Sequence, residues 1–183
     1  ADLHDTTYGI TSDPLTQFAC VFSALIHDAD HCGVPNSTLV TEDVPIAAVY
    51  KYKSIAEQNS VALAWGLLMD PAYKDLRAAI SCNQDEFTRF RQLVVNSVMA
   101  TDIMDKEDNG FRKARWEKAF SEGAMAESDS VAINRKATIV IEHLIQASDV
   151  AHTMQHWHVY SKWNQRLFNE MYLSFKQGRS DQN

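Results

Sequence analysis

His27 and Asp28 are adjacent in the chain, and together these two residue types can bind a metal ion. Neighbouring side chains leave a helix about 100° apart, so an imidazole nitrogen and a carboxylate oxygen can converge on one hard cation. A carboxylate can also bridge two metals that share a hydroxide. This chemistry is typical of a metal-dependent phosphohydrolase, which the pair therefore indicates.

Two further polar residues follow, because Asp30 and His31 come three and four positions after His27. On a continuous helix this spacing places His31 on the same face as His27. Residues 18–22 are apolar enough to be buried, and buried polar groups need partners such as a metal or a hydrogen-bond network. The alternative is a helix end that faces water and is terminated by Gly33 and Pro35. For the dipeptide alone the alternative is favoured, and the surrounding pattern reverses that preference.

Residues 24–36, with the sequence ALIHDADHCGVPN, resemble the His-Asp signature of the class I 3′,5′-cyclic nucleotide phosphodiesterases, a branch of the HD-domain phosphohydrolases. Further segments resemble other parts of the family in the same order. They are residues 54–59 (SIAEQN), 98–102 (VMATD) and 145–151 (IQASDVA), followed by Trp163 and the run to Gly178. The resemblance covers most of the chain from residue 18 to residue 178. It implies an all-α fold, a compact multi-helix bundle of the HD-domain and cyclic nucleotide phosphodiesterase type.

The resemblance also implies a role for particular residues. His27, Asp28 and Asp149 are expected to bind two divalent ions, Zn²⁺ with Mg²⁺ or Mn²⁺, and Asp28 is expected to bridge them. The other implied site residues lie around these ions: His31, Glu57, Thr101 and Asp102 behind the ligands, and His152, Trp163 and Leu167 at the substrate.

Without the resemblance, several of these residues have simpler interpretations. An isolated Asp such as Asp149 within a helix usually faces solvent, and Glu57 alone is a helix-surface charge. Thr101 and Asp102 can form a helix C-terminus, and His31 can be a hydrogen-bonded core residue. His152 and His156 have zinc-ligand spacing, but pocket-wall or surface histidines are favoured because no third ligand matches them.

The implied reaction is in-line hydrolysis of cAMP or cGMP by a hydroxide held between the metals, with a His protonating the leaving 3′ oxygen. The family's His-Asn-x-x-His motif, which supplies that acid and a further metal ligand, does not occur in residues 1–183. We therefore expect residues 1–183 to be the central portion of one catalytic domain, without that motif and without the C-terminal purine-pocket helices. A further departure is His152, which stands where the family usually has Asn.

Two other functions remain open from the sequence. One is an HD-type phosphohydrolase that acts on another phosphate ester. The other is a catalytically incompetent module that binds a metal or a partner helix, which the missing upstream histidines favour and the intact acidic residues disfavour.

Composition restricts the partners and the compartment. The 183 residues are 45% hydrophobic, which suits one globular domain, and the formal net charge of -7 argues against nucleic acid and anionic membranes as partners. Three cysteines without metal-site spacing indicate free thiols in a reducing compartment. No signal sequence or membrane-spanning run is visible, since the longest apolar run covers only residues 61–69. We expect a cytoplasmic protein, or a cytoplasmic domain of a larger membrane protein, with fusion to other signalling domains open.

Hydrophobic spacing and capping signals predict a chain of helices. Asp13-Pro14 opens the first helix, and Asn83 with Glu86 forms a capping box for a later one. The expected helices cover residues 14–31, 45–68, 71–80 and 83–104, a charged helix follows Asn109-Gly110 and runs to residue 120, and one or two long helices cover 130–177. The expected connections are a connector over 34–44, a break at Asn109-Gly110 and a polar loop over 122–129.

Overall fold

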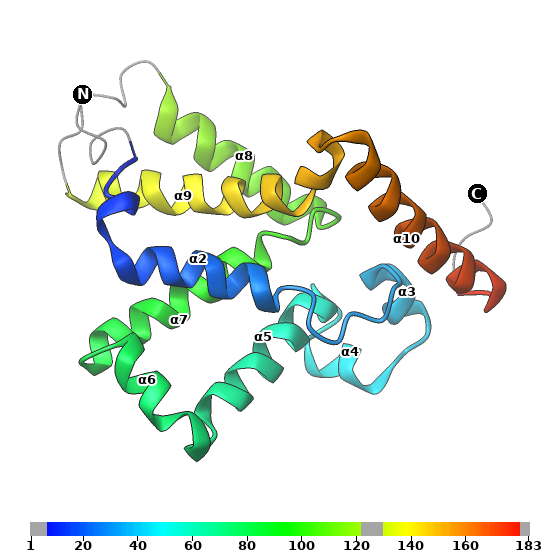
Figure 1. Cartoon of the computed structure of the whole chain (residues 1–183), viewed down its shortest axis with the longest axis horizontal. Helices are drawn as coiled ribbons and strands as arrows, with labels where there is room; N and C mark the ends of the chain where they lie inside the picture. The colour runs from blue at the N-terminus through cyan, green and yellow to red at the C-terminus, as the bar shows by residue number, and fades with distance from the viewer. Residues whose placement is uncertain (1–6, 122–129, 180–183) are drawn as a thin grey trace.

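The computed structural model describes residues 7–121 and 130–179, and this part of the chain consists of helices without a strand. Figure 1 shows α9 crossing the molecule, with α8 on its outer side and α2 on its inner side. α5 and α6 form a V at one end, and α10 extends away from the bundle toward the C-terminus. The elements are η1 (Ile10–Ser12), α2 (Pro14–Ile26), α3 (Asn36–Thr41), α4 (Pro45–Val49), α5 (Ile55–Met69), η2 (Pro71–Tyr73), α6 (Lys74–Ile80), α7 (Gln84–Met99), α8 (Lys106–Phe120), α9 (Ser130–Asp149), η4 (Ala151–Met154) and α10 (Trp157–Lys176). The all-α prediction is confirmed.

The main core lies between α2, α5 and α7, with Phe90 of α7 at its centre. Phe90 is fully buried, and its ring lies 5.8 Å from that of Phe18 and 6.3 Å from that of Trp65, measured between centroids. Burying a Phe side chain contributes about 1.5–3 kcal/mol. Because Ala19 and Ile26 of α2 belong to the same cluster, this core fixes α2 up to its last turn.

α2 begins where the sequence predicts. Asp13 is its N-cap, and Asp13 Oδ1 accepts hydrogen bonds from the backbone N–H groups of Leu15, at 3.2 Å, and Thr16, at 3.4 Å. Arg89 of α7 forms an ion pair with the same carboxylate. The cap therefore joins the start of α2 to the helix against which α2 packs.

α2 ends at Ile26, so the prediction of a helix up to His31 is wrong. The backbone N–H of His27 still bonds to Ser23 at 3.0 Å, but the next bonds, from Ala29 to Ile26 and from His31 to Asp28, are those of tight turns. Asp30 has a left-handed backbone with a φ of 62°. The expected common helix face of His27 and His31 therefore does not exist.

The packing of a second, smaller core explains this early end. Val34 is buried with Leu39, Ala47 and Ile55, so the chain has to turn back directly after the His-Asp pair. Gly33 has a φ of +73°, and a Cβ at this position would lie 3.0 Å from Cγ of Glu170 in α10. The left-handed backbone at this turn thus favours glycine, and an added Cβ would also press against the Glu170 side chain.

Four other predicted features also need correction. The connector over 34–44 contains the helix α3, and α7 ends at Met99 rather than near residue 104. The predicted helix over 45–68 is two helices, because Lys51, Tyr52 and Ser54 between them have positive φ values. Asn109-Gly110 lies inside α8 instead of breaking the chain.

The remaining predicted elements agree with the structure. Asn83 caps α7, and residues 130–177 form the two long helices α9 and α10. The predicted loop over 122–129 lies outside the described residues. Within the part of the chain that is described, every helix is too short or too polar to cross a bilayer.

Candidate metal centre

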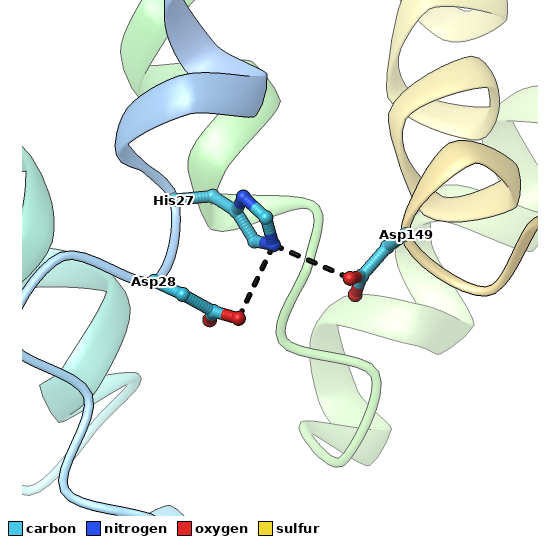
Figure 2. Close-up of side chains that lie close together, drawn as sticks. All are labelled: His27, Asp28 and Asp149. Atoms are coloured by element: carbon cyan, nitrogen blue, oxygen red, sulfur yellow. Dashed lines mark hydrogen bonds and ion pairs between the residues drawn. The ribbon is translucent and has the colours of Figure 1, made fainter. Parts of the chain in front are cut away.

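His27, Asp28 and Asp149 come together at the junction of α2 and α9 (Figure 2). His27 Nε2 lies 3.4 Å from Asp28 Oδ2 and 3.3 Å from Asp149 Oδ1. One potential ligand atom from each residue lies within 4.8 Å of the other two. Asp149 is the last residue of α9, so two helix ends bring together side chains that are 122 residues apart in the chain.

The ring of His27 is oriented by its own helix. Its Nδ1 lies 3.0 Å from the carbonyl oxygen of Ala24, and because a carbonyl only accepts, Nδ1 carries the hydrogen. Nε2 is therefore the nitrogen that faces the two carboxylates. This arrangement, with one ring nitrogen bonded to a carbonyl and the other directed at the site, is typical of metal-binding histidines.

The two carboxylates dominate the electrostatics of the site. The hydrogen bond to Asp149 raises the pKa of His27 to about 9, although burial opposes the change. The same hydrogen bond lowers the pKa of Asp149 against the effect of burial. The three side chains thus attract positive charge, and the Asp28 side chain is 66% exposed, so a cation can reach it from solvent. One imidazole and two carboxylates suit a divalent ion, so the residues fit a metal centre.

A pocket of about 600 Å³ opens beside His27, Asp28 and Asp149, which we call the metal donors. His152 and Trp163 line it, whereas Leu167 lies outside the lining and is 48% exposed on α10. Sequence reasoning missed several wall residues, although Ile145 lies four residues before Asp149 and therefore on the same face of α9. The missed lining residues are Ala24, Ile145, Ser148, Gln155 and Val159.

A second cluster of acidic and amide side chains, which we call the acidic hub, consists of Asn36, Ser54, Glu57 and Asp102. Asn36 Nδ2 donates to Glu57 Oε2 at 2.9 Å and to Asp102 Oδ2 at 3.2 Å. Ser54 Oγ donates to the same oxygen of Asp102 at 2.7 Å. Burial raises the pKa of Glu57 despite the hydrogen bond from Asn36, and the nearby Asp102 adds to the rise. The hub joins α3, α5 and the turn after α7.

Comparison with known proteins shows the family. The family model described as 3′5′-cyclic nucleotide phosphodiesterase matches residues 3–183. The chain belongs to this family.

Curated relatives carry the same family description. The human dual specificity calcium/calmodulin-dependent 3′,5′-cyclic nucleotide phosphodiesterase 1B is 28% identical over 160 residues, which cover 87% of this chain and 26% of the relative. A probable 3′,5′-cyclic-AMP phosphodiesterase, pde-4 of Caenorhabditis elegans, is 29% identical over 164 residues, 85% of this chain and 23% of the relative. The chain thus spans about a quarter of the length of these phosphodiesterases.

A solved structure has the same fold. It is the phosphodiesterase domain of the RhoPDE fusion protein from the choanoflagellate Salpingoeca rosetta, with a TM-score of 0.70 and 22% identity. The match covers 94% of this chain and 56% of that chain. The bundle is therefore a phosphodiesterase fold.

Two of the other implied site residues, Thr101 and His31, make local hydrogen bonds. The Thr101 hydroxyl donates to the carbonyl of Val98 at 2.7 Å and so caps the end of its own helix. His31 is exposed, and its Nδ1 accepts from the N–H of Gly33 at 3.2 Å. The roles of these two residues stay predictions.

Asn36 received no role from the sequence, although three polar contacts meet at its amide. Asparagine is common at helix starts, and Asn36 is the first residue of α3, so its position alone gives no sign of a wider role. Its partners are up to 66 positions away in the chain, and only the folded structure brings them together.

Proposed function

We propose that the chain is the catalytic portion of an enzyme that hydrolyses 3′,5′-cyclic nucleotides, cAMP or cGMP, to 5′-nucleoside monophosphates. The observation that carries this proposal is the convergence of His27, Asp28 and Asp149 beside a pocket, in a chain of the phosphodiesterase family. The spacing of these donors suits a metal ion that activates water against a phosphodiester.

We propose Zn²⁺ together with Mg²⁺ or Mn²⁺ as the metals. His27 Nε2 and the carboxylates of Asp28 and Asp149 would hold them, and Asp28, as the most exposed of the three, has oxygens free to bridge. When bound, the metals supply Lewis acidity that lowers the pKa of water and neutralises charge on the phosphate. Imidazole suits Zn²⁺, and carboxylates suit Mg²⁺ or Mn²⁺, so the three residues suit a mixed pair of ions.

The pocket has a polar end and an apolar wall, as binding of a nucleotide requires. His152 and Gln155 lie with the metal donors and can hydrogen-bond phosphate or ribose oxygens. Trp163 and Val159 of α10 form the apolar wall on which a purine ring can pack, while Leu167, one turn further along α10, lies outside the lining. His31, Glu57, Thr101 and Asp102 support the donors from behind.

We propose that residues 1–183 belong to one catalytic domain of a longer protein. The chain spans 26% of the human relative, so substrate preference and any fused domains are properties of the whole protein. Cys20, Cys32 and Cys82 are free thiols, which supports a reducing compartment such as the cytoplasm.

The test is hydrolysis of cAMP and of cGMP by the full-length protein with Mg²⁺ or Mn²⁺ present. We compare wild type with Asp28→Asn, which keeps the shape of the side chain but removes its charge. Asp75→Asn is the matched control, because Asp75 is exposed on α6, away from the pocket. Turnover that Asp28→Asn abolishes and Asp75→Asn retains supports the proposal. Turnover of neither nucleotide by wild type overturns it, and turnover of another phosphate ester would then indicate a different hydrolase.

A further inference from the structure

We propose that Asn36 is a positioning residue: its side-chain amide holds the Glu57 carboxylate in the orientation used beside the metal centre. The inference rests on the proposed hydrolysis of cyclic nucleotides and adds a residue to its machinery. Asn36 itself lies outside the pocket lining, so it acts through Glu57 and not on the substrate.

The amide of Asn36 is held at both ends. Its oxygen accepts from the backbone N–H of Ala56 at 3.0 Å, next to Glu57, which fixes which end of the amide carries the hydrogens. Its nitrogen then presents one N–H to Glu57 Oε2 at 2.9 Å and the other to Asp102 Oδ2 at 3.2 Å. All the hydrogen-bonding capacity of the NH₂ group is thus directed at carboxylates.

The side-chain nitrogen of Asn36 lies between two carboxylates, those of Glu57 and Asp102. Glu57 is partly buried and Asp102 is 5% exposed, so repulsion between their carboxylates is poorly screened by water. Each N–H of Asn36 stabilises the charged form of one carboxylate. Burial raises the pKa of Glu57 and the hydrogen bond from Asn36 opposes this rise, so the amide favours the anionic form of Glu57.

The position of Glu57 on α5 connects the hub to the metal donors. Ser60 is three residues further along α5, hence on the same helix face, and its hydroxyl donates to the carbonyl of Ala29 at 2.8 Å. Asn59 Nδ2 donates to Asp30 Oδ2 at 3.1 Å. One turn beyond Glu57, α5 is therefore bonded to the loop that carries Asp28, which fixes this part of α5 relative to Asp28.

The chain offers a matched control for the test. Ser54 Oγ donates to Asp102 Oδ2, the same oxygen that Asn36 reaches, but does not reach Glu57. Ser54→Ala therefore removes a hub hydrogen bond without touching the Glu57 carboxylate. Asn36→Ala removes all three amide contacts, and Asn36→Asp keeps the acceptor for Ala56 while replacing the donors with a further negative charge.

The first readout needs no turnover. The titration of Glu57 is followed by ¹³C NMR of glutamate-labelled full-length protein, with Glu57→Gln identifying the signal. We expect Asn36→Ala and Asn36→Asp to raise the pKa of Glu57 and Ser54→Ala to leave it in place, because only the first two remove the donor to the charged form. An unchanged titration in both Asn36 variants overturns the proposal, whether or not the protein hydrolyses cyclic nucleotides.

The second readout is a kinetic cycle with cAMP or cGMP. We expect Asn36→Ala to lower kcat by about 10- to 100-fold, as for other groups that orient a metal site from behind, and to move the acidic limb of its pH profile upward. In the Glu57→Gln background the same change is expected to have little further effect, because residues that act as a unit are not additive. Additive losses, or an equal loss in Ser54→Ala, mean a structural hub only and overturn the proposal. Inactive wild type overturns the proposed function, while the NMR titration still decides the role of Asn36.

Discussion

The metal donors and the acidic hub are two acidic clusters whose carboxylate oxygens differ in exposure and in hydrogen-bond partners. The side chains of Asp28 and Asp149 are 66% and 41% exposed, and the bonds described for their carboxylates go to His27. Asp102 is 5% exposed and accepts from Ser54, from Asn36 and from the backbone N–H groups of Met104 and Asp105. The carboxylates of the first cluster keep lone pairs free for a cation, whereas Asp102 in the second uses its oxygens to accept hydrogen bonds from the protein. Acidic residues placed where they could bind a cation thus differ from those that stabilise the fold in what their oxygens contact.

The largest expected effect is the loss of metal affinity in Asp149→Asn. We expect Mn²⁺ affinity to fall by more than about 100-fold, since loss of a ligand exceeds the cost of losing a group behind it. Isothermal titration of the full-length protein with Mn²⁺ measures the change. Asp75→Asn, exposed on α6, is expected to bind as wild type does. Wild-type affinity in Asp149→Asn would remove this residue from the centre.

Asp102→Ala tests the other side of the comparison. We expect the free energy of unfolding to fall by about 3 kcal/mol, because one buried and three partly buried donors lose their acceptor. Urea denaturation measures it, with Asp149→Asn as the reference that leaves the hub intact. A midpoint for Asp102→Ala no lower than that of the reference would contradict the structural role of the hub.

Asp13 is an intermediate case, since its carboxylate is partly exposed yet bonded to the protein. We expect Asp13→Ala to cost about 1 kcal/mol as a lost N-cap. Burial alone would raise the pKa of Asp13, but the hydrogen bonds from Arg89 and Thr16 lower it.

The sign of this pKa shift predicts a pH dependence. The stabilisation by Asp13 is complete above the unfolded-state pKa of about 3.9 and is lost as the pH falls through the lower folded-state pKa. The difference in urea midpoint between wild type and Asp13→Ala is therefore expected to be constant near neutral pH and to shrink below pH ~4. A difference that grows on acidification would contradict the assigned partners.

The smallest expected effect is a gain in stability at a site in neither cluster. Gly66 lies within α5, and an added Cβ meets no atom within 4 Å, so Gly66→Ala should stabilise by about 0.5–1 kcal/mol. The opposite sign is expected at Gly33, where φ is +73° and Glu170 lies 3.0 Å from an added Cβ. Thermal unfolding of both variants tests this, and a loss of stability in Gly66→Ala would mean that α5 packs more tightly at this point.

Local chemistry in the sequence was enough to predict where helices begin. Asp13-Pro14 and Asn83 are caps whose effect needs only neighbouring residues, and both predictions are confirmed. The end of α2 was not predictable in this way, since it depends on burial of Val34 against residues that follow it and on the approach of α10 to Gly33. The apolar pattern predicted one helix over residues 45–68, whereas the left-handed backbone at residues 51, 52 and 54 separates α4 from α5.

The candidate site was predictable to a different degree. His27 and Asp28 stand out by type and adjacency, but nothing local connects them to Asp149, which the family resemblance supplied. Wall residues such as Ser148 and Val159 are ordinary helix residues until α9 and α10 are placed. Asn36 was missed for the same physical reason, because its partners lie on elements that meet only after folding.

Ser54 precedes α5 and is a residue type that usually caps its own helix, yet its side chain makes no cap hydrogen bond. Its hydroxyl reaches Asp102, and the N–H of Ala56 in the first turn is instead satisfied by Asn36, 20 residues earlier in the chain. The first turn of α5 is thus capped by a side chain of α3. The helix that presents Glu57 is completed at its first turn only when α3 docks, so secondary structure at this end of the site forms cooperatively with tertiary structure.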